Sequence, residues 1–517
     1  MFSFKTLPSP SITGTSARLG RLIVSKSHVL DTPTFISQGS RGVVPHLSHD
    51  TLQNHTNIKG VYTALEDFVE KNPGKQPIYT TPTTLRQFIS LPSTQFSILA
   101  PRRAPPISCP AANTDDSISI LTSVGYRFLT WQDYSKAVKK LRPDVVVSMP
   151  DIPDQKPGKN RGPKMVMRTE LWLRELLGQN MEWAEEEGIA AEVGQKGRTP
   201  IFAPLLTLEI EEQRLYLEFL GERKEEVSGL AIYDYRQLLE ALYPLLEEMG
   251  LADLPRLSLD NPKTPLGVLD QIEAGVDVLS ANFVQEATDA GIALDFYFPT
   301  VDMGLQRAES GNREKKVLGL DMWGFEYAPD LRPLSFGLGG GEEGQGGRTC
   351  DCYACRRHHR AYVQHLLQAK EMTAWVLLQI HNYHIFQKFF VAVRASIAAG
   401  TYEQDKEVFR NTYVEELPEK TGQGPRVRGY QFKTEGGAKK KNPPAFKSKG
   451  LGERHDDGQS EAGGVRIGGD EKEKLEEAEE VGEGKGVDLG VDLGVDAEEL
   501  VERGMGKISV IDDSLTG

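Results

Sequence analysis

Arg-Thr-Cys-Asp-Cys-Tyr-Ala-Cys-Arg-Arg, at residues 348–357, is the most informative stretch of this 517-residue chain. It holds Cys350, Cys352 and Cys355, and the chain has only one other cysteine, Cys109. Three of the four thiols therefore lie in one short loop. Cysteines that only fill a hydrophobic core would be scattered along the sequence. Thiolates and imidazoles bind Zn²⁺ in tetrahedral sets of four, and a Cys₃His set leaves no open position for water. The stretch predicts a structural zinc site.

The spacing alone does not identify the fourth ligand. His381 follows on a predicted helix, with 25 residues between it and the last cysteine. His384 lies about one helical turn beyond it on a similar face, and His358, His359 and His365 also compete. A redox-active cysteine group is the alternative to a metal, but Cys-x-Cys-x-x-Cys lacks the βαβ context of a thioredoxin-like motif. The residues favour zinc and leave these histidines open.

The composition is that of a soluble protein with a sizeable core, since 39% of the residues are hydrophobic and 26% are charged. The net charge of −14 is unevenly spread, so it does not exclude a nucleic-acid partner, for which the local patch matters. Clustered cysteines in a long chain are typical of metal binding and not of a secreted disulfide framework. No apolar run reaches the roughly 18 residues of a membrane span, and we expect no transmembrane segment.

The first 27 residues lack acidic side chains and contain many serines and threonines. This composition superficially resembles a transit peptide. The run Arg18–Val24 has strand character, however, and favours a native first β-hairpin.

Short apolar runs alternate with helical patterns from about residue 15 to residue 417. This alternation predicts an α/β fold with a parallel sheet or barrel, and about six units favour a barrel. The expected strands are 33–37, 144–148, 199–205, 228–232, 256–259 and 276–279. The expected helices are 131–141, 168–187, 211–220, 235–249 and 265–274.

The composition changes near the C-terminus. Residues 421–469 are rich in Gly, Lys and Pro and contain Lys439–Lys441, and residues 470–483 form an acidic run. Such segments bury too little apolar surface to offset the entropy of ordering. We therefore expect two regions, a folded one at 1–419 and a disordered low-complexity tail at 420–517. The glycine-rich loop 337–347 lacks the ending of a phosphate-binding loop and is expected to be a flexible connection.

Several segments resemble the tRNA-guanine transglycosylases, the queuine tRNA-ribosyltransferase family. Around the cysteines these are 330–334, 360–367 and the His381-Asn382 pair, and elsewhere they are 17–20, 32–40 and 263–277. The resemblance covers about residues 15–415. It implies a (β/α)8 TIM barrel with an inserted zinc-binding helical subdomain at about 330–400. In this family the zinc histidine opens a His-Asn pair, which selects His381 and implies one structural Zn²⁺ per subunit on Cys350, Cys352, Cys355 and His381.

The resemblance also implies a reaction, the exchange of wobble guanine 34 for queuine in tRNAs with GUN anticodons (Asp, Asn, His, Tyr), a step of queuosine biosynthesis. This chemistry uses one carboxylate as nucleophile on the ribose and another as general acid/base, because a covalent intermediate splits one difficult exchange into two easier steps. The family places the nucleophile three residues past the aspartate of a Gly-Val/Ile-Asp motif. In this chain that position holds Ser280, after Asp277.

Other parts of the family's pocket are also missing. The Asp-Ser-Gly-Gly-Phe-Gln loop is absent between Asn54 and Ala100, and the Gln-Gly-Gly loop is absent after 202–206. The Gly-Leu-Ala-Val-Gly-Glu loop is reduced to Gly229–Asp234, and the base-recognising acid matches Asp151 only with a one-residue shift. These losses, together with the segment 45–52, resemble the accessory, non-catalytic branch of the family.

We therefore expect no catalytic residue in this chain and a heterodimer with a catalytic subunit. The zinc subdomain would provide the pairing surface, and Arg356, Arg357 and Arg360 are candidate contacts to tRNA phosphates. The branch implies a cytoplasmic protein and leaves open a peripheral association with the mitochondrial outer membrane. Two alternatives stand beside this reading. One is a self-sufficient homodimeric transglycosylase with Asp295 or Asp277 as a rewired nucleophile, and the other is a zinc-stabilised RNA-binding scaffold.

Overall fold

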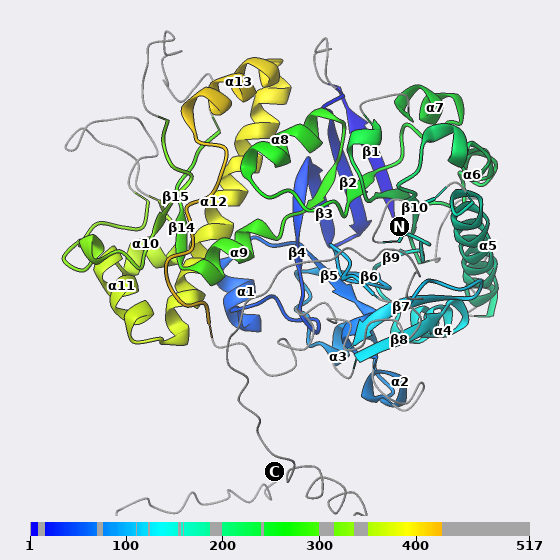
Figure 1. Cartoon of the computed structure of the whole chain (residues 1–517), viewed down its shortest axis with the longest axis horizontal. Helices are drawn as coiled ribbons and strands as arrows, with labels where there is room; N and C mark the ends of the chain where they lie inside the picture. The colour runs from blue at the N-terminus through cyan, green and yellow to red at the C-terminus, as the bar shows by residue number, and fades with distance from the viewer. Residues whose placement is uncertain are drawn as a thin grey trace, which may run out of the picture. The chain divides into compact units, whose positions relative to one another are not determined.

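Eight parallel strands close into a barrel (Figure 1). In chain order they are β4 (Thr34–Gln38), β5 (Gly60–Ala64), β6 (Phe96–Ala100), β9 (Val145–Val147), β10 (Ile201–Leu205), β11 (Gly229–Ile232), β12 (Arg256–Ser258) and β13 (Val278–Ser280). The ring closes where β13 pairs with β4, with Val278 opposite Thr34. This confirms the predicted TIM barrel. The computed structural model describes residues 2–8, 16–69, 76–109, 111–122, 125–153, 157–158, 160–186, 199–238, 242–298, 315–335 and 350–425.

The barrel strands are short and apolar because both of their faces are buried. Side chains alternate along each strand, and they divide into two hydrophobic clusters. One set fills the barrel interior and includes Ile36, Ile98, Phe202 and Val278. The other set packs outward against the helices and includes residues such as Val61 and Leu99.

All six strands expected from the sequence are present. Two further barrel strands, β5 and β6, escaped prediction because a short apolar run with no clear period is ambiguous between strand and helix. Helix α4 (Trp131–Leu141) has the expected bounds. The others agree with shifted ends, namely α5 (Gly162–Glu186), α6 (Ile210–Glu222), α8 (Pro265–Glu273) and α7 (Tyr243–Glu248), the last of which covers only part of the predicted 235–249.

The N-terminal residues form a three-stranded antiparallel sheet of β1 (Ser3–Leu7), β2 (Leu19–Ser25) and β3 (His28–Thr32). The predicted hairpin is confirmed, since β2 pairs with β3. Leu22, Val24 and Leu30 of this sheet are buried in the same cluster as the barrel interior. The sheet therefore closes the end of the barrel from which the strands begin.

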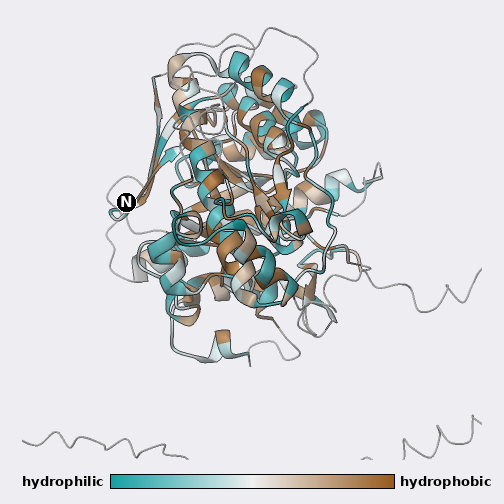
Figure 2. Ribbon diagram, turned by 90° about the vertical axis from the view of Figure 1, so that its left-hand side faces the viewer, coloured by the Kyte–Doolittle hydropathy of each residue, from teal (hydrophilic) through white to brown (hydrophobic). Residues whose placement is uncertain are grey.

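A second group of elements carries the cysteines and packs beside the barrel (Figure 1). It consists of α9 (Phe283–Ala290), the two-stranded β14 (Ile292–Leu294) and β15 (Gly319–Asp321), α10 (Tyr353–Arg357), α11 (Arg360–Gln368), α12 (Met372–Ala399) and α13 (Tyr402–Thr412). Figure 2 shows hydrophobic and hydrophilic residues alternating along the helices. Helix α12 is apolar on most sides, as expected of a helix buried between two layers. It packs on the barrel through Phe386 and Phe390, whose rings lie 4.9 and 5.5 Å from that of Phe35.

Short elements complete the described chain. They are α1 (His49–His55), η1 (Leu65–Asp67), α2 (Pro77–Thr80), α3 (Leu85–Phe88), the hairpin β7 (Ser117–Thr122) with β8 (Gly125–Thr130), and η4 (Phe325–Tyr327). None of the described helices is long and apolar enough to cross a bilayer. The predicted flexible loop 337–347 and the predicted tail from residue 426 on lie outside the described residues.

Candidate metal centre and the barrel mouth

The structure brings together the four residues that the sequence selected as zinc ligands. The ligand atoms of Cys350, Cys352, Cys355 and His381 all lie within 4.8 Å of one another. The three sulfurs are 3.7, 3.6 and 3.3 Å from His381 Nδ1. In a tetrahedral zinc site with ordinary Zn–S and Zn–N bonds, sulfur and nitrogen ligands are about 3.6 Å apart. The cluster therefore has the size and the donor set of a closed Cys₃His zinc site.

The cysteine loop has its own local geometry. Cys352 stands at the N-cap of α10, and its Sγ accepts a hydrogen bond from the Cys355 backbone N–H at 3.3 Å. Cys350 is fixed by its N–H, which donates to the Ser335 carbonyl at 3.4 Å. A hydrogen bond donated to sulfur favours the thiolate, the form that binds metal.

The His-Asn pair ties α12 to β14. His381 Nε2 lies 2.9 Å from the Leu294 carbonyl, and Asn382 Oδ1 accepts the Leu294 N–H at 2.8 Å. Asn382 Nδ2 donates to Thr288 Oγ1 and to the Ile292 carbonyl. Because Nε2 donates to a carbonyl, Nδ1 is left with the lone pair that faces the sulfurs. The pair therefore both orients the imidazole and anchors the strand beside it.

The cluster is electrostatically coupled. Hydrogen bonds from Cys350 and Cys352 lower the pKa of the Cys355 thiol. Burial lowers the pKa of His381, but the negative charge of Cys355 outweighs it and raises that pKa well above its usual value. The four groups therefore interact strongly in one buried site, as ligands that share a divalent cation would.

Three of the four competing histidines are engaged elsewhere. His384 Nε2 lies 2.7 Å from Asp351 Oδ1. The His358 ring stacks on Tyr362 at 4.8 Å, and His359 caps α11 by accepting the Tyr362 N–H. Among the described histidines, only His381 belongs to a metal-sized cluster.

The candidate phosphate contacts divide into two kinds. Arg356 and Arg357 are exposed on α10. Arg360 is only 6% exposed, and it pairs with Asp330 at 3.0 Å and donates to the Pro333 carbonyl at 2.9 Å. The expectation that Arg360 reaches tRNA is therefore wrong, because its guanidinium binds the loop before the cysteines through Asp330 and Pro333.

The position that the sequence predicts for the family's nucleophile lies at the end of β13, where the barrel strands finish. Ser280 is buried there, and its Oγ accepts a hydrogen bond of 2.6 Å from Gln38 Nε2, at the end of β4. In TIM-barrel enzymes the active site lies at this end of the strands. The position is occupied by a neutral hydroxyl paired with a neutral amide, and not by a carboxylate.

Asp151, the nearest match to the base-recognising acid, is fully buried and fully occupied. Its Oδ1 accepts from Asn113 Nδ2 at 2.7 Å and from Arg161 Nη2 at 2.6 Å. Its Oδ2 accepts from Arg168 Nη1 at 3.0 Å. A carboxylate with these partners has little capacity left to hydrogen-bond a base.

Two more arginines stand at the mouth, directly after β6. Arg103 Nε donates to Asp67 Oδ1 at 2.7 Å, and the Arg103 N–H donates to Glu66 Oε1 at 2.6 Å. Arg102 Nη2 donates to Asn113 Oδ1 at 2.9 Å. Burial raises the pKa of Glu66, although Arg103 opposes this shift. At the mouth, Glu66 and Asp67 are thus held by Arg103, whereas Arg102 bonds the amide oxygen of Asn113.

The two alternative nucleophiles are also committed. Asp277 precedes β13, at the opposite end of the barrel, and accepts both Arg18 Nε at 2.9 Å and Arg18 Nη2 at 2.6 Å. Asp295 follows β14 and accepts Tyr297 Oη at 2.9 Å and Ser335 Oγ at 2.7 Å. Both carboxylates lie in structural hydrogen-bond networks away from Ser280.

Comparison with known protein families covers both the barrel and the cysteine-bearing subdomain. A sequence model of the family described as Queuine tRNA-ribosyltransferase matches residues 13–415. The chain belongs to this family. Its barrel and cysteine-bearing subdomain are therefore those of a queuine tRNA-ribosyltransferase, as the resemblance implied.

Relatives in the family carry a more specific name. A protein of Schizosaccharomyces pombe is 36% identical over 447 residues, which cover 86% of this chain and 91% of the relative. A human relative is 28% identical over 414 residues, covering 74% and 92% respectively, and one from Xenopus tropicalis is 28% identical over 432 residues, covering 77% and 96%. All three are named queuine tRNA-ribosyltransferase accessory subunit 2.

The network around Asp151 was not found from the sequence. Asn113 lies in a loop that is far in the sequence from Arg161 and Arg168 at the start of α5, and arginines are common on protein surfaces, so the sequence carried little signal for the network. The adjacent pair Arg102-Arg103 would have been a signal only if β6 had been recognised, since the two residues would then have been placed at the barrel mouth.

Proposed function

We propose that this chain is the non-catalytic accessory subunit of a heterodimeric queuine tRNA-ribosyltransferase. The complex would exchange wobble guanine 34 for queuine in tRNAs with GUN anticodons, those for Asp, Asn, His and Tyr. The names of the relatives support the accessory role. The observation that carries the proposal is Ser280, which pairs with Gln38 at the position of the family's nucleophile.

The chemistry of the exchange explains why Ser280 matters. The ribose carbon becomes cationic in an oxocarbenium-like transition state, and a carboxylate both attacks and stabilises it. A hydroxyl carries no charge for this purpose, and Gln38 is not a base that could activate it. With Asp151 bound by two arginines as well, the reacting groups must come from the partner.

The metal cluster would have a structural role. We assign it one Zn²⁺ per chain, held by Cys350, Cys352, Cys355 and His381, with no position left open for substrate. The ion would fix the α10 loop onto α12, and the hydrogen bonds of His381 and Asn382 would pass that restraint to β14. In this account, residues 1–419 form the folded region and residues 420–517 the tail.

A pairing surface is available beside the cluster. Tyr353 contacts His55 of α1 at a ring separation of 4.4 Å, and it also lies 5.9 Å from His358, which stacks on Tyr362. These four rings come from α1, α10 and α11, and none of them is fully buried. Partly exposed aromatic side chains are enriched at the centres of protein interfaces. We call these four residues the aromatic ladder and assign the contact with the catalytic subunit to it.

The segment that carries α1 is fixed to the cysteine-bearing subdomain. His46 Nε2 lies 2.6 Å from Asp289 Oδ1 on α9. Helices α9 and α10 both pack on α12, so this contact ties the segment before α1 to the elements that carry α10. Arg356 and Arg357 are exposed next to the ladder and would reach tRNA phosphates in the assembled complex. We assign the complex to the cytoplasm, and a peripheral contact with the mitochondrial outer membrane remains compatible with it.

Native mass spectrometry of the co-expressed pair tests this proposal. We expect a complex of one copy of this chain with one catalytic subunit and a zinc ion in each. A homodimer of this chain that persists in the presence of the catalytic subunit would support the self-sufficient enzyme. Failure to capture any catalytic transglycosylase would support the scaffold alternative, and either result would contradict the proposal.

A further inference from the structure

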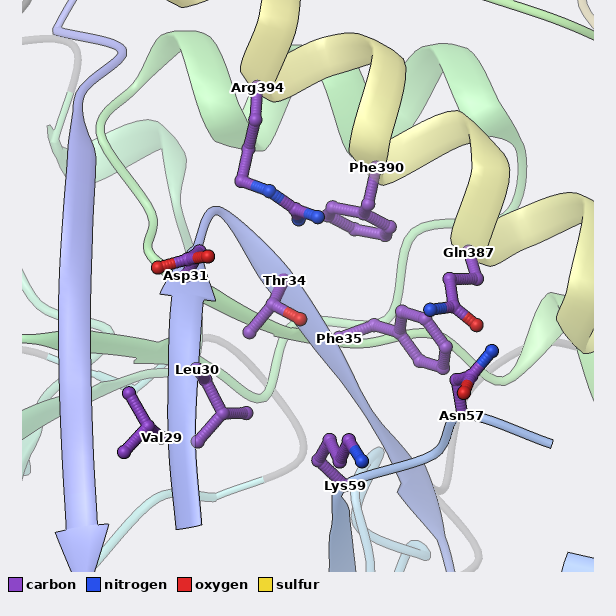
Figure 3. A pocket seen from close by; sticks show the side chains of 10 residues that line it. All are labelled: Val29, Leu30, Asp31, Thr34, Phe35, Asn57, Lys59, Gln387, Phe390 and Arg394. Carbon is purple, nitrogen blue, oxygen red and sulfur yellow. The ribbon is translucent and has the colours of Figure 1, made fainter. Parts of the chain in front are cut away.

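A hollow of about 140 Å³ lies between β3, β4 and α12, away from both the metal cluster and the barrel mouth (Figure 3). Arg394 and His381 are 13 residues apart on α12, which corresponds to roughly 20 Å along a helix that rises about 1.5 Å per residue. The hollow lies near the first residue of β4, at the end of the barrel opposite Ser280. The lining residues are Val29, Leu30, Asp31, Thr34, Phe35, Asn57, Lys59, Gln387, Phe390 and Arg394.

Two cations face this hollow with unused hydrogen-bonding capacity. Arg394 Nη1 donates to the Pro33 carbonyl at 2.7 Å, and no other described residue accepts a hydrogen bond from this guanidinium. Burial lowers the pKa of Arg394, and the negative charge of Asp31 opposes this shift. Lys59 is exposed and has no ion-pair partner among the described residues, and Figure 3 shows it at the lower edge of the hollow.

The neutral polar groups complement these charges. Gln387 lies one to two turns before Arg394 on α12, and Asn57 lies two residues before Lys59. Figure 3 shows the amides of Gln387 and Asn57 next to each other, with the Phe35 ring beside them. The hollow therefore offers a planar guanidinium fork, an ammonium and amide donors from two sides, which is the donor set that a carboxylate prefers.

The exposed apolar surface lies at the rim. Val29 is 49% exposed there, whereas Phe35 is 6% and Phe390 1% exposed, with their rings 5.5 Å apart. A ligand that was only a charged group would leave the apolar rim wet. The volume also limits the ligand, because sites for drug-sized molecules are about 300–1,000 Å³.

We infer that the hollow binds a carboxylate carried on a small apolar body, with Arg394 and Lys59 holding the carboxylate and Val29 at the rim contacting the body. The carboxylate could belong to a free acid or to the C-terminus of a peptide. Asp31 at the rim opposes an anion, but it is itself paired with Arg21 at 3.0 Å. The inference is independent of the role in tRNA modification.

Ligand-observed NMR with the full chain tests this site, with benzoate as the free-acid probe. A short peptide ending in leucine, with a free carboxylate or with a C-terminal amide, provides the second arm. We expect saturable binding of benzoate or of the free-carboxylate peptide, and whichever binds tighter identifies the source. The amide peptide should bind at least about tenfold more weakly than its acid, since a charge-assisted hydrogen bond is lost.

Four variants sharpen the test. Lys59→Gln and Arg394→Gln should each weaken binding about tenfold, and Lys59→Gln leaves the contact with Pro33 intact if Arg394→Gln disturbs folding. Asp31→Asn should strengthen binding, because it removes the opposing charge. Lys26→Gln, an equal charge change in the turn at the far end of β3, should have no effect.

Three results would overturn the inference. The first is the absence of saturable binding of either probe at millimolar concentration. The second is binding that Lys59→Gln and Lys26→Gln change equally, which would indicate a general charge effect. The third is competition by inorganic phosphate as strong as that by benzoate, because a site for any small anion would gain nothing from the apolar rim.

Discussion

At the scale of single residues, Leu294 shows how the metal cluster is built into the fold. Its carbonyl orients His381 and its N–H is held by Asn382, so that one residue of β14 fixes two neighbours on α12. This explains why a histidine followed by asparagine stands at this place. The same residues distinguish His381 from His384, which faces Asp351 instead.

The cluster makes a prediction about metal content. Cys352→Ser should lower the zinc bound per chain from one to well below one, because the site loses a thiolate and the N-cap sulfur of α10. Elemental analysis of the purified protein measures this. The matched control is His384→Ala, which should keep the zinc, and an unchanged stoichiometry in Cys352→Ser would count against the site.

Asn382 should contribute stability even though it is not a ligand. Asn382→Ala removes three buried hydrogen bonds and leaves the Leu294 N–H without its partner. We expect the free energy of unfolding to fall by roughly 2–4 kcal/mol, measured by denaturant titration. Asn54→Ala, at an exposed position of α1, should change it little, and equal effects of the two variants would refute the anchoring role.

Ser280 allows a direct test of the proposed lack of catalysis. Ser280→Asp places a carboxylate at the position proposed for the family's nucleophile, but it should not create base exchange, because Asp151 stays bound to Arg161 and Arg168. The new carboxylate would be buried beside the Gln38 amide, and burial raises the pKa of such a group. The variant should therefore be less stable at neutral pH by roughly 1–3 kcal/mol, and the deficit should shrink as the pH falls and the carboxyl is protonated.

Thermal unfolding of wild type and Ser280→Asp, measured from neutral to acidic pH, checks the stability prediction, with Ser280→Asn as the uncharged control. The same preparations serve for an exchange assay. Robust exchange by Ser280→Asp alone would show that one substitution is enough to make the mouth active. That result would contradict the expectation that the hydrogen bonds of Asp151 prevent catalysis.

At the scale of elements, the sequence predicted helices and strands best where their hydrophobic pattern was regular. Helix α4 is amphipathic and begins after Thr130, whose side chain caps it by accepting the Asp133 N–H, and its bounds were predicted correctly. Strands β5 and β6 are short, fully buried runs without a period, and tertiary closure of the barrel determines them more than local sequence does. The start of α5 was placed late because Gly162 and Pro163 look like loop residues, although proline is well suited to the first turn of a helix.

Helices α1, α10 and α11 together make the aromatic ladder, and pairing should depend on it. Tyr362→Ala or His55→Ala should weaken association with the catalytic subunit by at least about tenfold, as expected when an interface anchor worth more than 1.4 kcal/mol is truncated. Analytical ultracentrifugation of the mixed subunits measures this. Phe128→Ala, which removes a half-exposed ring on β8, is the control, and loss of pairing in that variant alone would place the interface elsewhere.

At the scale of the whole molecule, the chain has the barrel of its family, and the mouth holds a network of hydrogen bonds around Asp151. The cysteine–histidine cluster could be predicted because its three cysteines lie close together in the sequence and the family pattern supplies the histidine. The contacts of Asp151 could not, since the loop with Asn113 and the start of α5 with Arg161 and Arg168 meet only after both have folded against the end of β9. Absence of a motif could be read from the sequence, but what replaced it required the structure.

The central claim is that the chain supports catalysis without performing it, and incorporation of labelled guanine into tRNA with a GUN anticodon tests it most directly. The assay compares this chain alone, a catalytic subunit alone and the two together, each loaded with zinc. We predict no exchange above background by this chain alone and full exchange by the pair. Exchange by the purified chain alone, at a rate comparable to that of a catalytic subunit, would contradict the account.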